Sequence, residues 1–105
     1  MPICHRAATF ALALLMPAVA FASSDDAWEA MRADVSAKCL EATKDSVEEP
    51  KTVIDPFGSD HYGLALVWGR SKGGEVQVSY ICVYDKKTKT VEIGSELTDG
   101  VTFGE

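Results

Sequence analysis

Apolar residues recur along this chain with two different spacings, and the change falls at Pro50. Before Pro50 they lie three and four residues apart, which is the spacing of a helix with one buried face. The residues of this stripe are Trp28, Met31, Val35, Cys39 and Ala42. Because proline disfavours helical geometry at the residue before it, the helix is predicted to end before Pro50.

After Pro50, apolar and polar residues alternate, which is typical of half-buried strands. We predict strands at residues 51–54, 62–69, 75–85 and 90–93, separated by turn-forming segments. A three-residue turn at residues 71–73, with Gly73 in the left-handed conformation, would join the second and third of these strands. That turn predicts a register in which Tyr62 lies opposite Cys82.

This register gives the predicted sheet one face of large apolar residues and one face of smaller residues. The inner face consists of Tyr62, Leu64, Leu66, Trp68, Val76, Val78, Tyr80, Cys82, Tyr84, Val91 and Ile93. The helix stripe that contains Cys39 is the apolar surface available to cover it. We therefore predict an α+β fold, in which an N-terminal amphipathic helix packs on one face of a three- to four-stranded antiparallel meander.

The outer face of the predicted sheet is the candidate binding face. Its candidate residues are Gly63, Ala65, Val67, Ile81 and Val83. One interpretation, which we prefer, is that the segment from Leu97 to Phe103 folds back and covers this face. The face could also be an ordinary mixed surface, since scattered exposed apolar residues are normal, or it could bind a partner.

The first 22 residues have the layout of an export signal. A charged start with Arg6 precedes an apolar run over residues 7–21, and small residues stand on both sides of position 21 before Ser23. Pro17 interrupts the run, which is too short for a transmembrane helix. We expect cleavage after Ala22, which would leave residues 23–105 as a single periplasmic domain with no membrane insertion.

Two of the three cysteines, Cys39 and Cys82, lie in this expected mature domain. An even number of cysteines in a short exported chain predicts a disulfide. The alternative is a pair of buried free thiols, which an oxidising compartment disfavours. A bridge between cysteines 43 positions apart stabilises a protein by about 4 kcal/mol in the chain-entropy model.

The charge of the chain narrows the classes of partner. The whole sequence has a net charge of −6, and residues 23–105 contain nine basic residues against sixteen acidic ones. The resulting charge of −7 repels nucleic acid and anionic membrane surfaces, so neither is an expected partner. It would attract a basic protein or cations, although a charged surface that only maintains solubility is the simpler interpretation.

Candidate catalytic chemistry centres on His61, the single histidine of the expected mature domain. Ser59, Asp60 and His61 are the residue types of a hydrolase triad, but consecutive residues in an extended loop point away from one another. Local turn hydrogen bonds are the simpler role for this segment. A metal site from Asp55, Asp60 and His61 is geometrically possible, but the spacing matches no helix or hairpin ligand pattern. The sequence therefore predicts no catalytic residue, metal ligand or cofactor.

Three segments of the chain carry a resemblance to other proteins. They are Asp26-Ala27-Trp28, the stretch from Asp55-Pro56-Phe57-Gly58-Ser59 to Tyr62-Gly63-Leu64-Ala65-Leu66, and Cys82-Val83-Tyr84-Asp85-Lys86. With these segments the chain resembles a group of small exported proteins of Gram-negative bacteria that has no established activity. The resemblance implies a periplasmic location and the two-cysteine pattern, and it implies no chemistry.

We weigh three functions on this basis. The preferred hypothesis is a non-catalytic periplasmic binding or envelope-associated module, whose ligand and oligomeric state the sequence does not specify. The alternative is a small hydrolase or metal-dependent enzyme centred on His61. A third hypothesis is an inhibitor of a basic host enzyme such as lysozyme, because the periplasmic inhibitors of lysozyme are similar in size, acidity and disulfide use. Their Ser/Gly-rich inhibitory loop is missing from this chain.

Overall fold

The computed structural model describes residues 24–98. The signal peptide predicted at residues 1–22, and residues 99–103 of the predicted covering segment, therefore lie outside the described residues. The helix α1 (Ser24–Thr43) is followed by the strands β1 (Val47–Ile54), β2 (Tyr62–Ser71), β3 (Gln77–Asp85), β4 (Val91–Ile93) and β5 (Leu97–Thr98).

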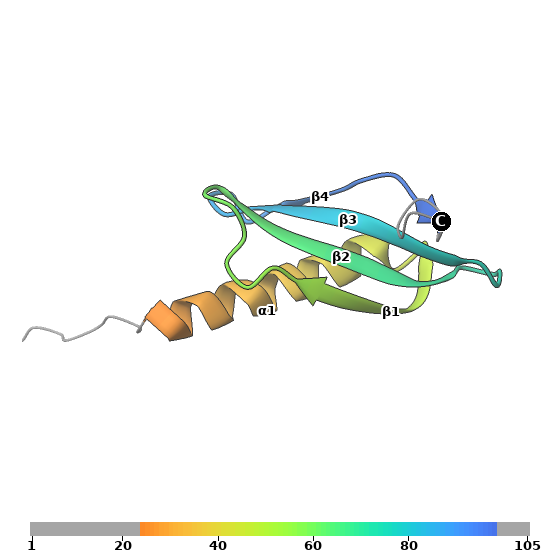
Figure 1. Ribbon diagram of the computed structural model, residues 1–105, viewed down its shortest axis with the longest axis horizontal. Coiled ribbons are helices and arrows are strands. Elements are labelled where there is room, and N and C mark those ends of the chain that lie inside the picture. Colours follow the sequence, from red (N-terminus) through yellow and green to blue (C-terminus); the bar gives the residue numbers. More distant parts are fainter. Residues whose placement is uncertain (1–23, 99–105) are drawn as a thin grey trace, which may run out of the picture.

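The strands form one antiparallel sheet in the order β1-β2-β3-β4, and α1 packs on one of its faces (Figure 1). β4 and β5 pair with successive parts of β3, so both lie along the same edge of that strand. This arrangement confirms the predicted α+β fold of one helix on an antiparallel sheet.

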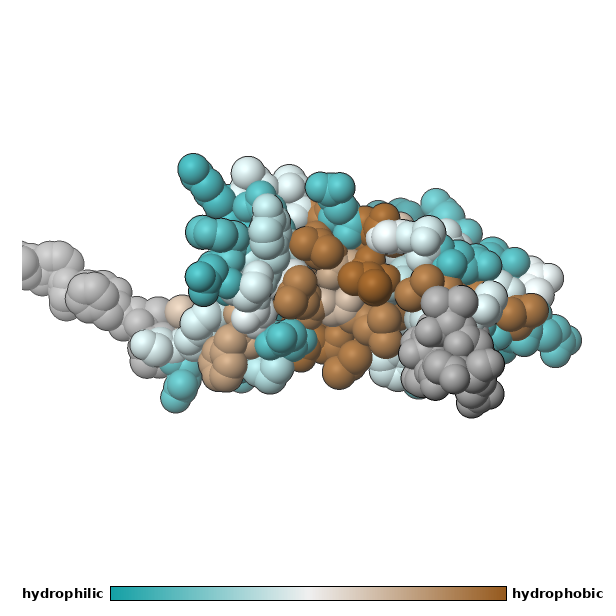
Figure 2. Space-filling model, turned by 45° about the horizontal axis from the view of Figure 1, so that its top comes forward, coloured by the Kyte–Doolittle hydropathy of each residue, from teal (hydrophilic) through white to brown (hydrophobic). Residues whose placement is uncertain are grey.

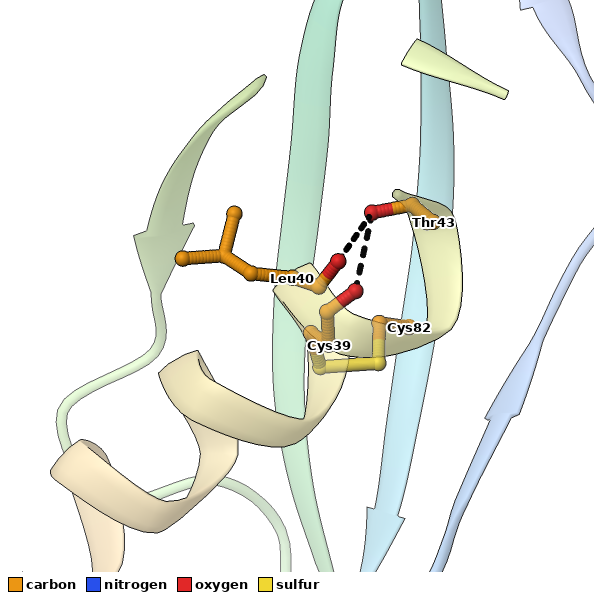
Figure 3. Close-up of a disulfide and its surroundings, with 4 residues drawn as sticks. All are labelled: Cys39, Leu40, Thr43 and Cys82. Carbon is orange, nitrogen blue, oxygen red and sulfur yellow. Dashed lines mark hydrogen bonds between the residues drawn. A yellow bond between two sulfur atoms is a disulfide. The ribbon is translucent and has the colours of Figure 1, made fainter. Parts of the chain in front are cut away.

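The buried side of α1 follows the predicted stripe except at its end. Val35 and Cys39 are fully buried, as predicted, whereas Ala42 is exposed and Thr43 is buried in its place. The single O–H of Thr43 is shared between the carbonyl oxygens of Cys39, at 2.9 Å, and Leu40, at 3.3 Å (Figure 3). Because the helix's own carbonyls satisfy this hydroxyl, a threonine can replace an apolar residue in the stripe.

The predicted disulfide between Cys39 and Cys82 is present and joins α1 to β3 (Figure 3). The Cα atoms of the two cysteines are 6.0 Å apart. Val35, Ala65, Val67 and Tyr84 surround the bridge and complete the main apolar cluster. The bridge therefore lies at the centre of the contact between the two layers.

The predicted register between β2 and β3 is wrong by three residues. Cys82 lies opposite Ala65 rather than opposite Tyr62. The cause is the turn: the amide of Ser71 donates to the carbonyl of Val76 at 2.8 Å, so the loop has four residues, 72–75, instead of the predicted three. A shift by an odd number of residues moves every side chain of one strand to the other face.

The faces of β2 are consequently the reverse of the prediction. Gly63, Ala65 and Val67 point toward α1 and are buried. The large residues of β2 lie on the opposite side, away from the helix: Tyr62, Leu64, Leu66 and Trp68. β3 keeps its predicted orientation, with Cys82 toward the helix and Ile81 and Val83 away from it.

Close approach of the helix explains why small residues face it. A Cβ added at Gly63 would lie 2.9 Å from the Cγ2 atom of Val35 in α1. At Gly69 the close neighbour is the edge strand instead, because a Cβ added there would lie 2.7 Å from the Cγ1 atom of Val47 in β1. A Cβ atom cannot lie this close to a neighbouring side chain unless that side chain moves. Glycine at these positions lets the backbones come together.

β1 is an edge strand that begins at Val47, earlier than the predicted start at residue 51. Its pairing with β2 is irregular between Glu48 and Lys51, and Glu49 has a positive φ of 50°. Pro50 lies in this irregular stretch, where its missing N–H breaks no regular ladder. The irregular pairing accommodates Pro50 within β1. For this reason the proline led the sequence analysis to start the strand too late.

Candidate functional site

The sheet face opposite α1 carries a continuous set of apolar side chains that nothing within residues 24–98 covers. Directly paired residues of an antiparallel ladder lie on the same face, and the pairings place eight apolar residues there. We call this surface the open face; it consists of Val53, Tyr62, Leu64, Leu66, Trp68, Ile81, Val83 and Leu97.

The centre of the open face is a row of three side chains, Val53, Leu66 and Ile81, across β1, β2 and β3. Val53 is 56% exposed and Ile81 is 49% exposed. Figure 2 shows apolar side chains gathered in the middle of the molecule, between hydrophilic side chains toward its two ends. A contiguous patch of this kind is unlike the single apolar residues that ordinary protein surfaces carry.

Charged side chains border the open face at both ends. Lys51 lies opposite Trp68, and Arg70 follows on the same face and forms an ion pair with Glu48 at 2.7 Å. At the other end, Asp85 lies opposite Tyr62 and Glu92 lies opposite Val83. An apolar centre with a polar rim is the usual organisation of a protein interface.

The structure brings two of the five predicted binding residues to this surface, Ile81 and Val83. Gly63, Ala65 and Val67 face the helix instead. The prediction that these three residues belong to the binding face is therefore wrong, and they form part of the contact between the helix and the sheet. Leu64, Leu66 and Trp68 take their place on the open face, although sequence reasoning placed them in the core. The alternation of small residues at positions 63, 65 and 69 was the signal that could have revealed this.

The preferred prediction for the C-terminal segment is not met in its described part. Leu97 and Thr98 form β5 beside β3, where Leu97 lies opposite Ser79. They extend the sheet along its edge instead of crossing the open face. The remaining residues of the predicted covering segment lie outside the described part of the chain.

A second surface feature is a groove of about 760 Å³ between residues 27–38 of α1 and the β3–β4 hairpin. We call it the helix–hairpin groove. Its apolar lining comes from Ala27, Trp28, Ala30 and Met31, and its charged and polar lining from Asp34, Lys38, Tyr84, Lys86 and Lys89. The structure thus brings Lys38 of α1 together with Lys86 and Lys89 of the hairpin, which lie almost fifty residues further along the chain.

Tyr84, Asp34 and Lys38 form a hydrogen-bonded network at one end of the groove. The Tyr84 hydroxyl donates to Oδ2 of Asp34 at 2.5 Å, and Nζ of Lys38 donates to the same oxygen at 3.0 Å. Burial, followed by the hydrogen bond to Asp34, raises the pKa of Tyr84 to about 12. The hydrogen bonds from Tyr84 and then Lys38 hold the pKa of Asp34 below its ordinary value. The network therefore contains a neutral phenol and a charged carboxylate at neutral pH.

Lys86 lies in the same groove, beside the Trp28 ring of the helix. Its Nζ atom donates to the carbonyl oxygens of Phe57, at 2.8 Å, and Ser59, at 2.6 Å. The same amino group lies 5.1 Å from the centre of the Trp28 ring, and this ring makes an edge contact with Phe57 at 5.0 Å. The loop that sequence reasoning examined for catalysis is thus held against the helix by packing and hydrogen bonds.

The residues of that loop serve local turns. Oγ of Ser59 accepts a hydrogen bond from the amide of Tyr62, as a turn role predicts, and Oδ1 of Asp55 accepts from two backbone amides of its own turn. His61 is exposed, and no hydrogen bond within residues 24–98 joins its imidazole to a carboxylate or hydroxyl. In the same range, no three His, Cys, Asp or Glu side chains are grouped to hold a metal ion.

Comparison of the chain with protein-family models, with curated proteins and with solved structures found no match. Among the described residues, no helix has the length and apolarity needed to cross a membrane. Proposals about function therefore rest on the sequence and structure of this chain.

Proposed function

We propose that this protein is an exported, non-catalytic binding module that holds another protein on the open face of its sheet. The observation that carries the proposal is the uncovered row of Val53, Leu66 and Ile81, with Trp68 beside it. A sheet that is apolar on both faces needs a layer on each face to remove it from water. Here α1 supplies one layer, and a partner would supply the other.

The shape and composition of the open face favour a protein partner over a small molecule. Small ligands bind in concave sites that surround most of their surface, whereas this face is the exposed side of a sheet. Trp68 is the kind of residue that contributes most to protein interfaces. The partner would present an apolar surface, with acidic groups toward Lys51 and basic groups toward Glu92.

We further propose that the module acts in the periplasm after cleavage of residues 1–22. The disulfide supports an oxidising compartment, because such bridges rarely persist in the cytosol. Intact-mass measurement of the exported protein tests this step. A chain that begins at Ser23, or within two residues of it, supports the proposal, and a mass that includes residues 1–22 rejects it.

Binding by the open face is tested with a matched pair of substitutions. Val53 and Val76 are 56% and 57% exposed, but Val76 lies outside the open face, one residue before the start of β3. We expect Val53→Glu to lose a periplasmic partner that both the wild type and Val76→Glu retain. Affinity capture from periplasmic extract, compared band by band across the three proteins, gives the answer. Equal capture by all three proteins would reject the open face as the binding surface.

The alternative of a small enzyme centred on His61 is tested separately. For a binding module, His61→Ala should change stability by less than about 0.5 kcal/mol, as is usual at exposed positions, and should leave partner capture intact. A deletion strain complemented with His61→Ala but not with Val53→Glu would support the binding module. The opposite pattern would support the enzyme.

A further inference from the structure

The helix–hairpin groove combines positive charge with an apolar floor in a chain whose net charge is −6. Lys38 comes from α1, whereas Lys86 and Lys89 come from the hairpin between β3 and β4. The single carboxylate of the lining is Asp34, and it already accepts hydrogen bonds from Tyr84 and Lys38. The groove is therefore locally cationic, opposite in sign to the rest of the molecule.

Two of the three lysines are held in place with donor capacity to spare. A lysine ammonium has three N–H donors. Lys86 uses two of them on the carbonyl oxygens of Phe57 and Ser59, and Lys38 uses two on Asp34 and on the carbonyl oxygen of Lys89. Each amino group keeps one N–H for a ligand, and its position is fixed before any ligand arrives, which lowers the entropy cost of binding.

Asp34 lies within electrostatic range of Lys89, but no ion pair joins the two side chains. Within residues 24–98, neither Lys86 nor Lys89 forms an ion pair. Asp55 lies within electrostatic range of Lys86, but its carboxylate accepts the backbone amides of Phe57 and Gly58. Carbonyl acceptors leave the ammonium charge intact, so these two lysines can attract an anion.

The floor of the groove suits an apolar group. Ala27 and Ala30 are small and exposed, so they leave room between the helix and the hairpin, and Met31 and Trp28 supply apolar contact area beside them. The volume of 760 Å³ falls within the range of about 300–1,000 Å³ found for small-molecule sites. An inorganic anion would leave this floor wet, and a purely apolar molecule would leave the lysines without a charged partner.

We infer that the helix–hairpin groove is a binding site for a small amphiphile, with an anionic head group held by Lys86 and Lys89 and an apolar chain lying against Ala30 and Met31. This site is separate from the open face and does not depend on the function proposed for it. The head group could be a carboxylate, as in a fatty acid, or a phosphate, as in a lipid fragment, since both match lysine donors.

The test is titration of the disulfide-bonded protein with decanoate and with decyl phosphate, below their micelle concentrations, by isothermal calorimetry. Because the two probes differ only in head group, their relative affinities show whether the site prefers a carboxylate or a phosphate. We expect saturable binding of at least one of them, and much weaker binding of the uncharged decanol. Decyltrimethylammonium, which has the opposite charge, should not compete.

Three variants locate the site. Lys89→Gln should weaken binding about tenfold, the usual effect of losing one charge-assisted hydrogen bond. Lys87→Gln is its matched control, because Lys87 belongs to the same hairpin and does not line the groove. Ala30→Leu should also weaken binding by filling the floor, whereas Ala33→Leu, at an exposed helix position outside the lining, should not.

Several results would overturn the inference. No binding of either probe up to millimolar concentration would do so, as would equal affinities for Lys89→Gln and Lys87→Gln. Equally tight binding of decyltrimethylammonium would show that charge has no part in recognition. If Val53→Glu abolished binding while Ala30→Leu did not, the probes would be binding to the open face, and the groove would be rejected as the site.

Discussion

Ala65 of β2 lies directly opposite Cys82 of β3, under the disulfide that attaches α1 to the sheet. Because the bridge holds the Cα atoms of Cys39 and Cys82 at 6.0 Å, the helix backbone lies close to this row of the sheet. Ala65 is buried in the cluster that contains the bridge, and at Gly63 on the same face an added Cβ would lie 2.9 Å from Cγ2 of Val35 in α1. The disulfide and the small residues of β2 are therefore two parts of one packing arrangement.

Removal of the disulfide should destabilise the domain strongly. A loop closed over a sequence separation of 43 residues is worth about 4 kcal/mol in the chain-entropy model, and measured losses in small secreted domains are about 2–5 kcal/mol. We expect the variant with both Cys39→Ala and Cys82→Ala to lose this amount in urea unfolding. A reducing agent should lower the stability of the wild type and leave that of the variant unchanged; equal stability of the two proteins would contradict the prediction.

Gly63→Ala should also destabilise the protein, by about 1–3 kcal/mol, which is typical of an overpacked core. The added Cβ would lie 2.9 Å from Cγ2 of Val35 and 3.1 Å from Cδ1 of Tyr84. Thermal unfolding measures the loss. The matched control is Gly94→Ala, whose added Cβ would come no closer than 3.5 Å to any atom. Combining Gly63→Ala with Val35→Ala should cost less than the sum of the two, because the second change removes the clash.

The sequence predicts the two layers and the bridge because each depends on a strong local signal. The spacing of Val35 and Cys39 places both on one side of a helix, and the alternation around Cys82 places it inside a strand. Once both cysteines lie on apolar stripes, a bridge between the layers follows. These inferences need no knowledge of how the strands pair.

The register between β2 and β3 depends on the length of one turn, and local sequence does not determine that length here. Gly73 has a positive φ of 75° in the four-residue loop, just as it would have in the predicted three-residue turn. The alternation of β2 offers two apolar faces, one with Leu64, Leu66 and Trp68 and one with Ala65 and Val67. The choice between them rests on the close approach of the helix, which is a tertiary constraint.

The helix–hairpin groove could not be predicted for a related reason. Lys38 lies almost fifty residues from Lys86, and nothing in the local pattern of either segment indicates that the two side chains meet. Their proximity requires both the packing of α1 on the sheet and the short β4, which brings the hairpin beside the helix. The sequence analysis therefore singled out none of these lysines as a candidate site residue.

The reversed faces of β2 give a direct mutational test with two valines. Val67 is fully buried beneath the helix, whereas Val53 is 56% exposed on the open face of the neighbouring strand. Val67→Ala should cost about 2 kcal/mol through lost burial and a residual cavity. Val53→Ala should stay within about 0.5 kcal/mol, as surface changes usually do. Urea unfolding of the two variants measures both stability losses. A larger loss for Val53→Ala than for Val67→Ala would support the register that the sequence predicted.

The stability of the domain at alkaline pH should depend on the Tyr84 hydroxyl. The pKa of Tyr84 is raised from 10.0 to about 12, by burial first and by its hydrogen bond to Asp34 second. The folded protein thus holds this proton more tightly than the unfolded chain does. The associated stability is complete below pH 10 and is lost as the pH rises toward 12, with a slope of up to about 1.4 kcal/mol per pH unit.

Tyr84→Phe removes this titration while keeping the ring in the apolar cluster around the disulfide. The variant should be less stable than the wild type at neutral pH, because it leaves Asp34 without the phenol hydrogen bond. The difference between the two should shrink above pH 10, since only the wild type loses the contribution of residue 84 there. The pKa of Tyr80 is also raised, by burial first, so some alkaline loss should remain in both proteins. Urea unfolding from pH 9 to pH 12 measures the two curves, and parallel curves across that range would show that the Tyr84 proton is not linked to folding.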